Sequence, residues 1–209
     1  DLSSLRRHPV IFSKSRIRSR VHRLAYPDYV DIVAFDTAGR VAGVHRFLCL
    51  LTFTAYSADP REIPLLRERI TALLDRAGLQ ADEHDGRELL RVIELYPRDE
   101  LFQADSDTLF RTVTAINRIQ ERRQTRVFVR QDTRSSFVNC LVYVPRDIYT
   151  TELRVRIQTH LEARCQAEES EFTTQFSESV LVRVHFILKC EMGSQLGDAL
   201  DSLESEIQS

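Results

Sequence analysis

Hydrophobic residues recur with two different periods along the chain, and the changes of period mark the expected elements. Residues 28–36 (DYVDIVAFD) are rich in β-branched and aromatic residues, as are residues 41–56. The TAGR stretch between them places Gly39 where a tight turn requires it, so we expect a hairpin whose second strand is the more buried. A shorter strand is expected over residues 9–12 (PVIF).

Three helices are expected next, because the apolar period changes to that of a helix. The first covers residues 62–78, and Gly78 occupies the usual position of a C-terminal cap. The second covers residues 86–96, and a longer third helix covers about 99–122. The apolar stripe of the third helix consists of Leu109, Val113, Ile116 and Ile119.

The second half of the chain returns to a period of two. We expect strands over residues 125–132 and 135–147, joined by the turn TRSS, then a helix over 150–165 and strands over 169–178 and 179–189. An acidic helix over 196–207 ends the chain. One face of the last strand carries Val180, Val182, Val184, Phe186 and Leu188.

Hairpin-linked strands with segregated helices are typical of the α+β class with mostly antiparallel sheets. We expect two small α/β-sandwich units. The first spans residues 1–98 and includes a basic N-terminal segment. A connecting helix spans 99–124, and the second unit spans 125–209 with the acidic helix at its end.

Composition excludes several classes of protein. The 209 residues carry a net charge of −2, so no overall field favours nucleic acid or a membrane. No apolar run approaches the roughly 18 residues that cross a bilayer. The four cysteines are widely spaced, which fits free thiols in a reducing compartment and indicates a cytoplasmic protein. The chain begins without Met, and we expect it to be a piece of a longer protein.

Searches for catalytic chemistry find no strong pattern. The six glycines form neither GxGxxG nor a phosphate loop, and the histidines show no HxxxH spacing. The cluster Glu83, His84, Asp85 reads as a solvated loop rather than a metal site. His185 lies in an apolar strand, and we expect a paired surface histidine, with a functional role as the alternative. We therefore expect no catalytic, cofactor-binding or metal-binding residue in this chain.

The motif YPRDELFQ (96–103) and its shorter echo VPRDIY (144–149) pose the main question about chemistry. Pro97 disfavours helical geometry at Tyr96 and ends the preceding helix. Asp99 is expected to cap or charge the first turn of the next helix. Pro145 similarly ends a strand, with Thr150 or Thr151 as the following cap. We interpret both motifs as signals for starting helices, with arginines that pair with carboxylates or contact a partner.

The basic segment before residue 24 leaves an alternative open. Its cations lie near Tyr26 and Tyr29, an arrangement that can contact RNA. The rest of the chain cancels this charge, so we favour a solvated face or a contact with an acidic partner surface, and we expect no nucleic-acid partner. The basic residues are Arg6, Arg7, Lys14, Arg16, Arg18, Arg20 and Arg23.

Several long stretches nevertheless resemble one family. Residues 12–57 (FSKSRIRSRVHRLAYPDYVDIVAFDTAGRVAGVHRFLCLLTFTAYS) resemble a segment of the large bacterial NAD-specific glutamate dehydrogenases. The stretches EIPLLRERI, YPRDELFQ, ERRQTRVFVRQD, FVNCLVYVPRDIYTTELR and FSESVLVRVHFILK are similar to the same family, in order, across nearly the whole chain.

The resemblance implies a non-catalytic place in a longer enzyme. In that family, ACT-like (ferredoxin-like) modules occupy the N-terminal region, and the glutamate-oxidising domain with its NAD site comes later. The two expected units would then be ACT-like modules that assist assembly of a homo-oligomer or regulation, and their first partner would be the rest of their own polypeptide. The alternative is a freestanding ACT-like module that senses an amino acid or binds RNA.

An amino-acid effector would need an arginine or a backbone amide for its carboxylate. The loop at Gly39 and Arg40 is the best candidate in the first unit. The arginines of the two PRD motifs, Arg98 and Arg146, are further candidates for an effector or an interface.

Overall fold

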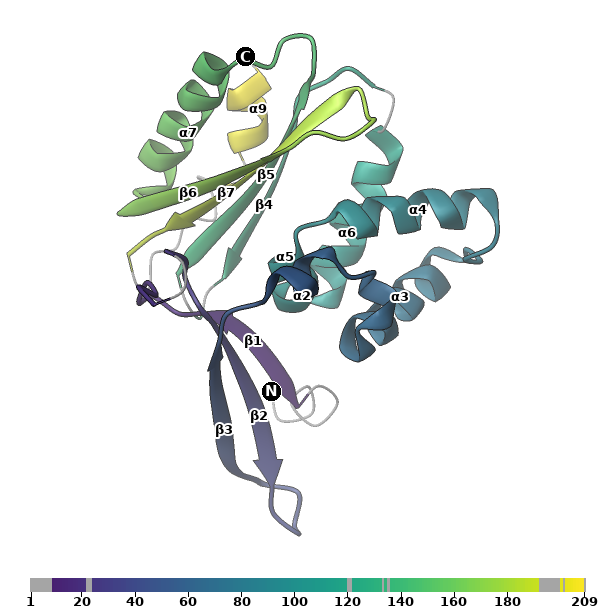
Figure 1. The fold of residues 1–209 in the computed structure, drawn as a ribbon, viewed down its shortest axis with the longest axis vertical. Coiled ribbons are helices and arrows are strands. Elements are labelled where there is room, and N and C mark those ends of the chain that lie inside the picture. The colour runs from purple at the N-terminus through teal and green to yellow at the C-terminus, as the bar shows by residue number, and fades with distance from the viewer. Residues whose placement is uncertain are drawn as a thin grey trace.

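The structure is a computed structural model that describes residues 9–21, 24–119, 122–132, 134, 136–191, 200 and 202–208 (Figure 1). Its first sheet contains β1 (Val10–Lys14), β2 (Asp28–Phe35) and β3 (Val41–Cys49) in the order β1-β2-β3. Both pairings are antiparallel. The predicted hairpin is confirmed: Gly39 adopts a φ of 74°, and the Asp36 N–H donates to the Arg40 carbonyl at 2.8 Å.

The prediction that the second hairpin strand is the more buried one is wrong. Residues 41–48 of β3 are all exposed, whereas β2 contains the buried Asp28, Asp31 and Val33. The β2 strand lies between two neighbours, but β3 is an edge strand. The apolar composition of β3 indicated burial, but the described residues do not cover this strand.

A helical layer follows the first sheet. It contains α2 (Phe53–Ser57), a short 3-10 turn η1 (Pro60–Glu62), α3 (Pro64–Ala77), α4 (His84–Leu95), α5 (Arg98–Gln103) and α6 (Ser106–Ile119). The Gly78 cap is confirmed, with φ 68° and its N–H directed to the Asp75 and Leu74 carbonyls. The predicted stripe of α6 is also confirmed as buried.

The single helix expected over 99–122 is instead two helices. Ala104 is extended, with φ −64° and ψ 142°. The Asp105 side chain then accepts the Thr108 N–H at 2.8 Å and begins α6. Arg69 donates to the Phe102 and Ala104 carbonyls at the end of α5. These contacts to the backbone stabilise the interruption between α5 and α6. The spacing of apolar residues does not predict such contacts.

The second sheet confirms the strand prediction for the second half of the chain. It contains β4 (Arg126–Asp132), β5 (Phe137–Pro145), β6 (Glu169–Gln175) and β7 (Leu181–Lys189) in the antiparallel order β4-β5-β7-β6. Helix α7 (Thr151–Cys165) connects β5 to β6, and Thr150 is its cap, accepting the Leu153 N–H. Helix α9 (Leu203–Gln208) covers the end of the expected acidic helix, whose residues 196–199 and 201 lie outside the described residues.

The second sheet has a packed layer on each face. Helices α7 and α9 cover one face over a core that includes Val142, Val184 and Phe186. The helical layer lies on the other side of the sheet (Figure 1). There, Leu141, Phe128 and Tyr143 pack against the core of helices α3 to α6. The free thiols Cys140, Cys165 and Cys190 are buried, and Cys49 is half-buried. The molecule is therefore α+β with two antiparallel sheets, as predicted, whereas the unit boundaries at 98 and 124 stay predictions.

Candidate functional site: a buried polar junction at helix α5

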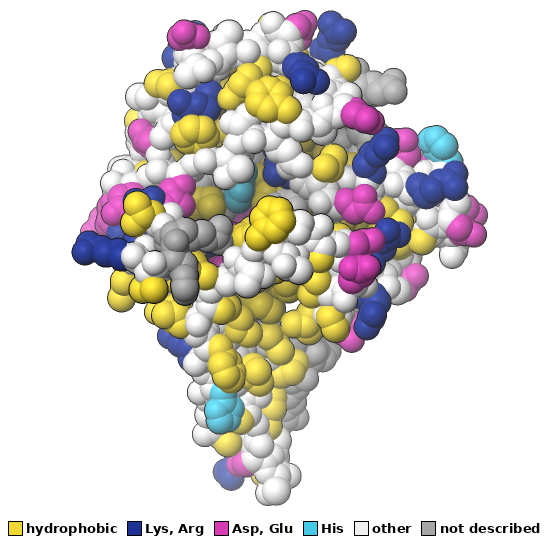
Figure 2. All heavy atoms as spheres, viewed as in Figure 1, with side chains coloured by type: hydrophobic (Ala, Val, Ile, Leu, Met, Phe, Trp, Pro, Cys, Tyr) yellow, Lys and Arg dark blue, Asp and Glu magenta, His cyan; other side chains and the backbone are white. Residues whose placement is uncertain are grey.

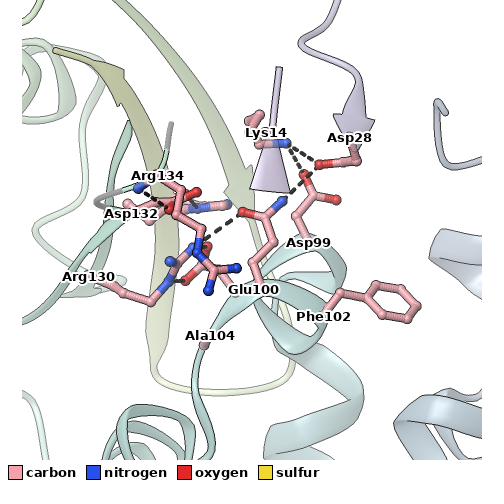
Figure 3. A network of polar contacts seen from close by, with 12 residues as sticks. Lys14, Asp28, Asp99, Glu100, Phe102, Ala104, Arg130, Asp132 and Arg134 are labelled. Atoms are coloured by element: carbon pink, nitrogen blue, oxygen red, sulfur yellow. Dashed lines mark hydrogen bonds and ion pairs between the residues drawn. The ribbon is translucent and has the colours of Figure 1, made fainter. Parts of the chain in front are cut away.

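The YPRDELFQ motif lies where the first sheet, the helical layer and the second sheet meet (Figure 3). As predicted, Pro97 separates two helices, since Tyr96 is extended after α4 and α5 begins at Arg98. Tyr96 and Leu101 are buried in the helical core. The apolar residues of the motif thus anchor α5, and its polar residues are left to face the two sheets.

Asp99 connects α5 to the first sheet. The Lys14 ammonium of β1 lies 3.0 Å from the Asp99 carboxylate and 3.1 Å from that of Asp28 on β2. The Tyr56 hydroxyl donates to Asp99 at 2.9 Å. Lys14 is 4% exposed, so a single buried cation is shared between two carboxylates. Asp99 was expected to cap or charge the first turn of this helix: it is not the cap, a position that Pro97 occupies, but it does place a charge in the first turn of α5. Its carboxylate binds Lys14 and Tyr56.

Glu100 connects the same helix to the second sheet. Its carboxylate accepts two hydrogen bonds from the Arg130 guanidinium of β4, at 2.7 Å from Nε and 2.6 Å from Nη2. Glu100 is 2% exposed. A two-point pair of this kind fixes the angle between its partners as well as their distance. Glu100 therefore sets the position of α5 on β4.

Gln103 joins the two ion-pair clusters. Its side-chain amide donates to Asp28 at 2.8 Å, and its carbonyl oxygen accepts from Arg130 at 3.3 Å. Phe102 adds an apolar contact to the first sheet, with its ring centroid 4.8 Å from that of Phe12. Successive turns of one short helix thus contact both sheets. We call the set Lys14, Asp28, Asp99, Glu100, Gln103 and Arg130 the α5 junction.

Arg98 begins α5 and points toward the loop after α2. It donates to the carbonyls of Tyr56 and Ala58, at 3.3 and 2.8 Å. The side chain is 5% exposed, and within the described part of the chain its Nε and Nη1 atoms have no hydrogen-bond partner. Arg98, the arginine of the first PRD motif, was expected to pair with a carboxylate or contact a partner, but its guanidinium donates to backbone carbonyls.

The junction carries unequal pKa shifts because three charges share one buried site. Burial lowers the pKa of Lys14, but Asp99 and Asp28 outweigh this effect and raise it overall. Burial raises the pKa of Asp28 to about 6, against the attraction of Lys14. Burial also acts to raise the pKa of Asp99, yet Lys14 and the Tyr56 hydroxyl lower it overall. Asp99 is therefore the stronger partner of Lys14.

His185 lies on the face of β7 that is directed toward the junction. It is 6% exposed and its Nε2 lies 3.1 Å from the Asn139 side-chain oxygen, so the expected surface position is wrong although the pairing is right. The strand is covered on both faces, which the alternation of its sequence did not reveal. Burial and the nearby Arg183 lower the pKa of His185 to about 3, against the attraction of Asp99.

The remaining candidate residues lie apart from the junction and from one another. Gly39 and Arg40 are at the tip of the β2–β3 hairpin, where Arg40 pairs with Asp36 at 2.9 Å. Arg146 follows β5, donates to the Ser177 carbonyl at 3.3 Å and lies over the Phe176 ring. Arg146 thus positions the turn between β6 and β7. An effector role for Gly39, Arg40, Arg98 or Arg146 stays a prediction.

The basic N-terminal segment contacts an acidic strand of its own chain. Arg16 pairs with Glu168 and donates to the Cys190 carbonyl at 2.7 Å. Arg18 pairs with Glu171 on β6. The expected alternatives were a solvated face or an acidic partner surface, whereas the acidic groups that these arginines contact belong to the same chain. Residues 6, 7 and 23 of the segment lie outside the described ranges. Arg18 and Glu171 also line a cleft of about 430 Å³, together with His185.

The side chains of the α5 junction bind one another and thereby hold α5 against the two sheets. Each carboxylate in it faces a cation or an amide donor, and the described residues contain no cluster of side chains arranged as a metal site. The sequence indicated the motif but not its partners, because Lys14 and Arg130 lie 85 and 30 positions from their carboxylates. No helix in the described part of the chain is long and apolar enough to cross a membrane.

Two family models match this chain. Residues 63–122 match the helical motif 1 of glutamate dehydrogenase, and residues 126–209 match its ACT2 domain. The NAD-specific glutamate dehydrogenase of Halomonas elongata is 47% identical over 178 residues, and that of Pseudomonas aeruginosa is 47% identical over 203. The protein of that name from Mycobacterium tuberculosis is 35% identical over 180 residues.

The matches cover most of this chain but little of each relative. They include 85%, 96% and 86% of the chain, but only 11%, 12% and 11% of the three relatives. The α5 junction draws its residues from both matched regions and from the strands that precede them. The chain therefore belongs to the family of large NAD-specific glutamate dehydrogenases, as a segment that carries their helical motif 1 and ACT2 domain.

Proposed function

We propose that this chain is a non-catalytic structural segment of an NAD-dependent glutamate dehydrogenase. The parent enzyme would convert L-glutamate, NAD and water to 2-oxoglutarate, ammonium and NADH. In this proposal, the NAD site and the catalytic residues lie elsewhere in the polypeptide. The segment contributes a rigid arrangement of two sheets to which the rest of the enzyme attaches.

The α5 junction is the observation that carries this proposal. The three polar residues of RDELFQ other than Arg98 all contact a β-strand, and one of them also contacts helix α2: Asp99 binds Lys14 and Tyr56, Glu100 binds Arg130, and Gln103 binds Asp28. Side chains engaged in this way are not free for general acid–base work on a substrate. They instead fix the positions of elements that are distant in sequence.

Catalysis can be tested by comparing two preparations. Glutamate-dependent reduction of NAD would be followed in the full-length polypeptide and in the purified 209-residue chain, at equal molar concentration. We expect activity in the full-length polypeptide alone. Activity in the 209-residue chain would contradict a non-catalytic role, and absence of activity from both would contradict the proposed parent reaction.

For the role within the enzyme, we propose assembly of a homo-oligomer in the cytoplasm rather than sensing of an amino acid. Sheet edges are natural docking surfaces, and this segment contributes two sheets to the enzyme. Mass photometry of the full-length enzyme with and without this segment would test assembly. We expect a smaller particle when the segment is removed. An unchanged particle mass would contradict the assembly role.

The sensing alternative makes an opposite prediction. A ligand that binds the folded state raises the free energy of unfolding as its concentration rises. We expect millimolar free amino acids to raise it by less than about 1 kcal/mol. A larger, saturable increase that is lost in Arg40→Ala, but not in Arg67→Ala, would favour an effector site at the hairpin tip.

A further inference from the structure

The β2–β3 hairpin presents apolar side chains on both faces of its sheet. Successive residues of a strand point to opposite faces. Phe47, 54% exposed, lies on one face, and Val44 and Leu48, 52% and 62% exposed, lie on the other. Figure 2 shows hydrophobic side chains gathered over the stem of this sheet on the visible face. We call these residues, with Ile32 and Val41, the hairpin surface.

The backbone of β3 is also unpaired along its outer edge. Val33 of β2 donates its N–H to the Pro9 carbonyl, on the β1 side. Because bonding direction alternates along an antiparallel strand, the even-numbered residues of β2 point toward β3. Their register partners in β3 are odd-numbered. The even-numbered residues, Ala42, Val44, Arg46 and Leu48, therefore direct their N–H and C=O groups away from the sheet.

The edges of the second sheet are protected in ways that β3 is not. Strand β6 carries Glu169 and Glu171, which bind Tyr26 and Arg18 of the N-terminal segment. Strand β4 has only seven residues and contacts α9. Strand β3 has nine residues, no proline and no acid, and its Arg46 is paired with Asp31. Long apolar edges without charge or proline pair readily with another strand.

The uncovered surface is too extensive for edge pairing alone. A second copy of β3, bound about a two-fold axis, would pair the edge but would leave apolar side chains on both faces. A sheet of this kind is normally covered by a further layer of the same domain. The polypeptide available for this is long, since the matched segment is only 11% of the Halomonas elongata relative.

The two ends of the described chain indicate which part of that polypeptide is near. The chain enters the first sheet through Pro9 and β1. It leaves through α9, which packs against β4 of the second sheet, at the opposite end of the view in Figure 1. Sequential elements are usually neighbours, and their connections are short. The residues before Asp1 are therefore better placed to reach the hairpin surface than the residues after Ser209.

We propose that the polypeptide preceding Asp1 supplies a β-strand that pairs with β3, together with apolar side chains that cover the hairpin surface. This rests on the proposed function only in taking the chain as a segment of a longer polypeptide. The partner strand would carry apolar residues on both faces, as β3 does. The first sheet would then have at least four strands.

The test is photo-crosslinking within the full-length protein. Leu48→p-benzoylphenylalanine and Phe47→p-benzoylphenylalanine place the probe on opposite faces of β3, so the second position serves if the first disturbs folding. Val155→p-benzoylphenylalanine, at a 44% exposed position on α7, is the matched control. Each variant is assembled from a mixture of ¹⁴N- and ¹⁵N-labelled copies, and crosslinked peptides are identified by mass spectrometry.

We expect both β3 probes to crosslink to residues before Asp1, in peptide pairs of uniform isotope label, and the control probe to give no such product. Mixed-label pairs would mean that another copy covers the surface and would overturn the proposal. Crosslinks to residues after Ser209, or none beyond those of the control, would also overturn it. Glutamate-dependent NAD reduction by the same preparations reports separately on the proposed function.

Discussion

Glu100 and Arg130 form a buried two-point ion pair between helix α5 and strand β4, with N–O distances of 2.6 and 2.7 Å. Burial lowers the pKa of Arg130, but Glu100 more than reverses this effect and raises it overall. The carboxylate is directed at β4 because Leu101, its neighbour in α5, is anchored in the helical core. One turn of helix thus couples the packing of the helical layer to the second sheet.

Breaking this pair from one side is expected to be costly. Arg130→Met leaves the Glu100 carboxylate buried without its cation, and we expect a loss of about 3–5 kcal/mol in the free energy of unfolding. The double variant Glu100→Leu with Arg130→Met removes both charges and should lose markedly less. Urea unfolding of both single variants and the double variant measures the coupling. A double variant as unstable as Arg130→Met would show that the cost lies in packing and not in the unpaired charge.

The two carboxylates around Lys14 are expected to differ in importance. At pH 8, Asp99→Asn should destabilise the chain more than Asp28→Asn, because the pKa of Asp99 is lowered in the folded state and that of Asp28 is raised. Lys14→Met should cost about 3–5 kcal/mol, since it leaves two buried carboxylates without a cation. Thermal and urea unfolding of the three variants would establish the order. Equal losses for Asp28→Asn and Asp99→Asn would contradict the unequal sharing of Lys14.

Local sequence signals predicted most helices and strands. The features that they did not predict depend on contacts between residues that are distant in the sequence. Gly39, Gly78 and Thr150 each occupy the turn or cap that their chemistry suggests. The break at Ala104 depends on Arg69 in another helix, which no local pattern can indicate. The burial of β3 was overestimated because apolar content shows what a strand can bury, not whether a neighbour is present.

The candidate site shows the same limit. The repeated PRD indicated that residues 97–99 begin a helix, and this is correct for Pro97 and α5. Asp99 does charge the first turn of α5, but its partner was not predicted, because Lys14 comes from a strand 85 residues earlier. His185 was placed on the surface for a related reason, since its strand alternates although both faces are covered. Pairing partners follow from topology, which a single sequence leaves open.

Acidification should destabilise the fold through His185. Its pKa falls to about 3 in the folded state, below the ordinary value of 6.5. Between pH 6.5 and pH 3 the imidazole is protonated in the unfolded state but neutral in the folded state. The stability that neutral His185 contributes is therefore complete above pH 6.5 and is lost as the pH falls below it. From pH 7 to pH 5 the loss is about 2 kcal/mol. Asp28 acts in the opposite direction, because its folded pKa is raised to about 6 and protonation favours the folded state.

A variant comparison separates the two groups. His185→Gln removes the imidazole, so the difference in unfolding free energy between the native chain and this variant should shift by about 2 kcal/mol between pH 7 and pH 5. His84→Gln, which changes a histidine whose side chain is 79% exposed, is the matched control. Urea midpoints at pH 7, 6 and 5 give the comparison. A constant difference across this range would show that His185 does not titrate as the structure requires.

Two glycines should respond oppositely to the same added methyl group. A Cβ at Gly86 in α4 would lie 1.8 Å from the Gln80 carbonyl oxygen and 2.7 Å from its carbon, so the backbone before the helix must move. The better helix propensity of Ala offsets about 1 kcal/mol, and we still expect Gly86→Ala to lower the unfolding free energy by about 2 kcal/mol or more. At Gly43 in β3, an added Cβ meets nothing within 4 Å. Gly43→Ala should therefore be neutral or stabilising by up to about 1 kcal/mol in the 209-residue chain. Urea unfolding of both variants tests the pair, and a tolerated Gly86→Ala would mean that the turn at Gln80 relaxes without cost.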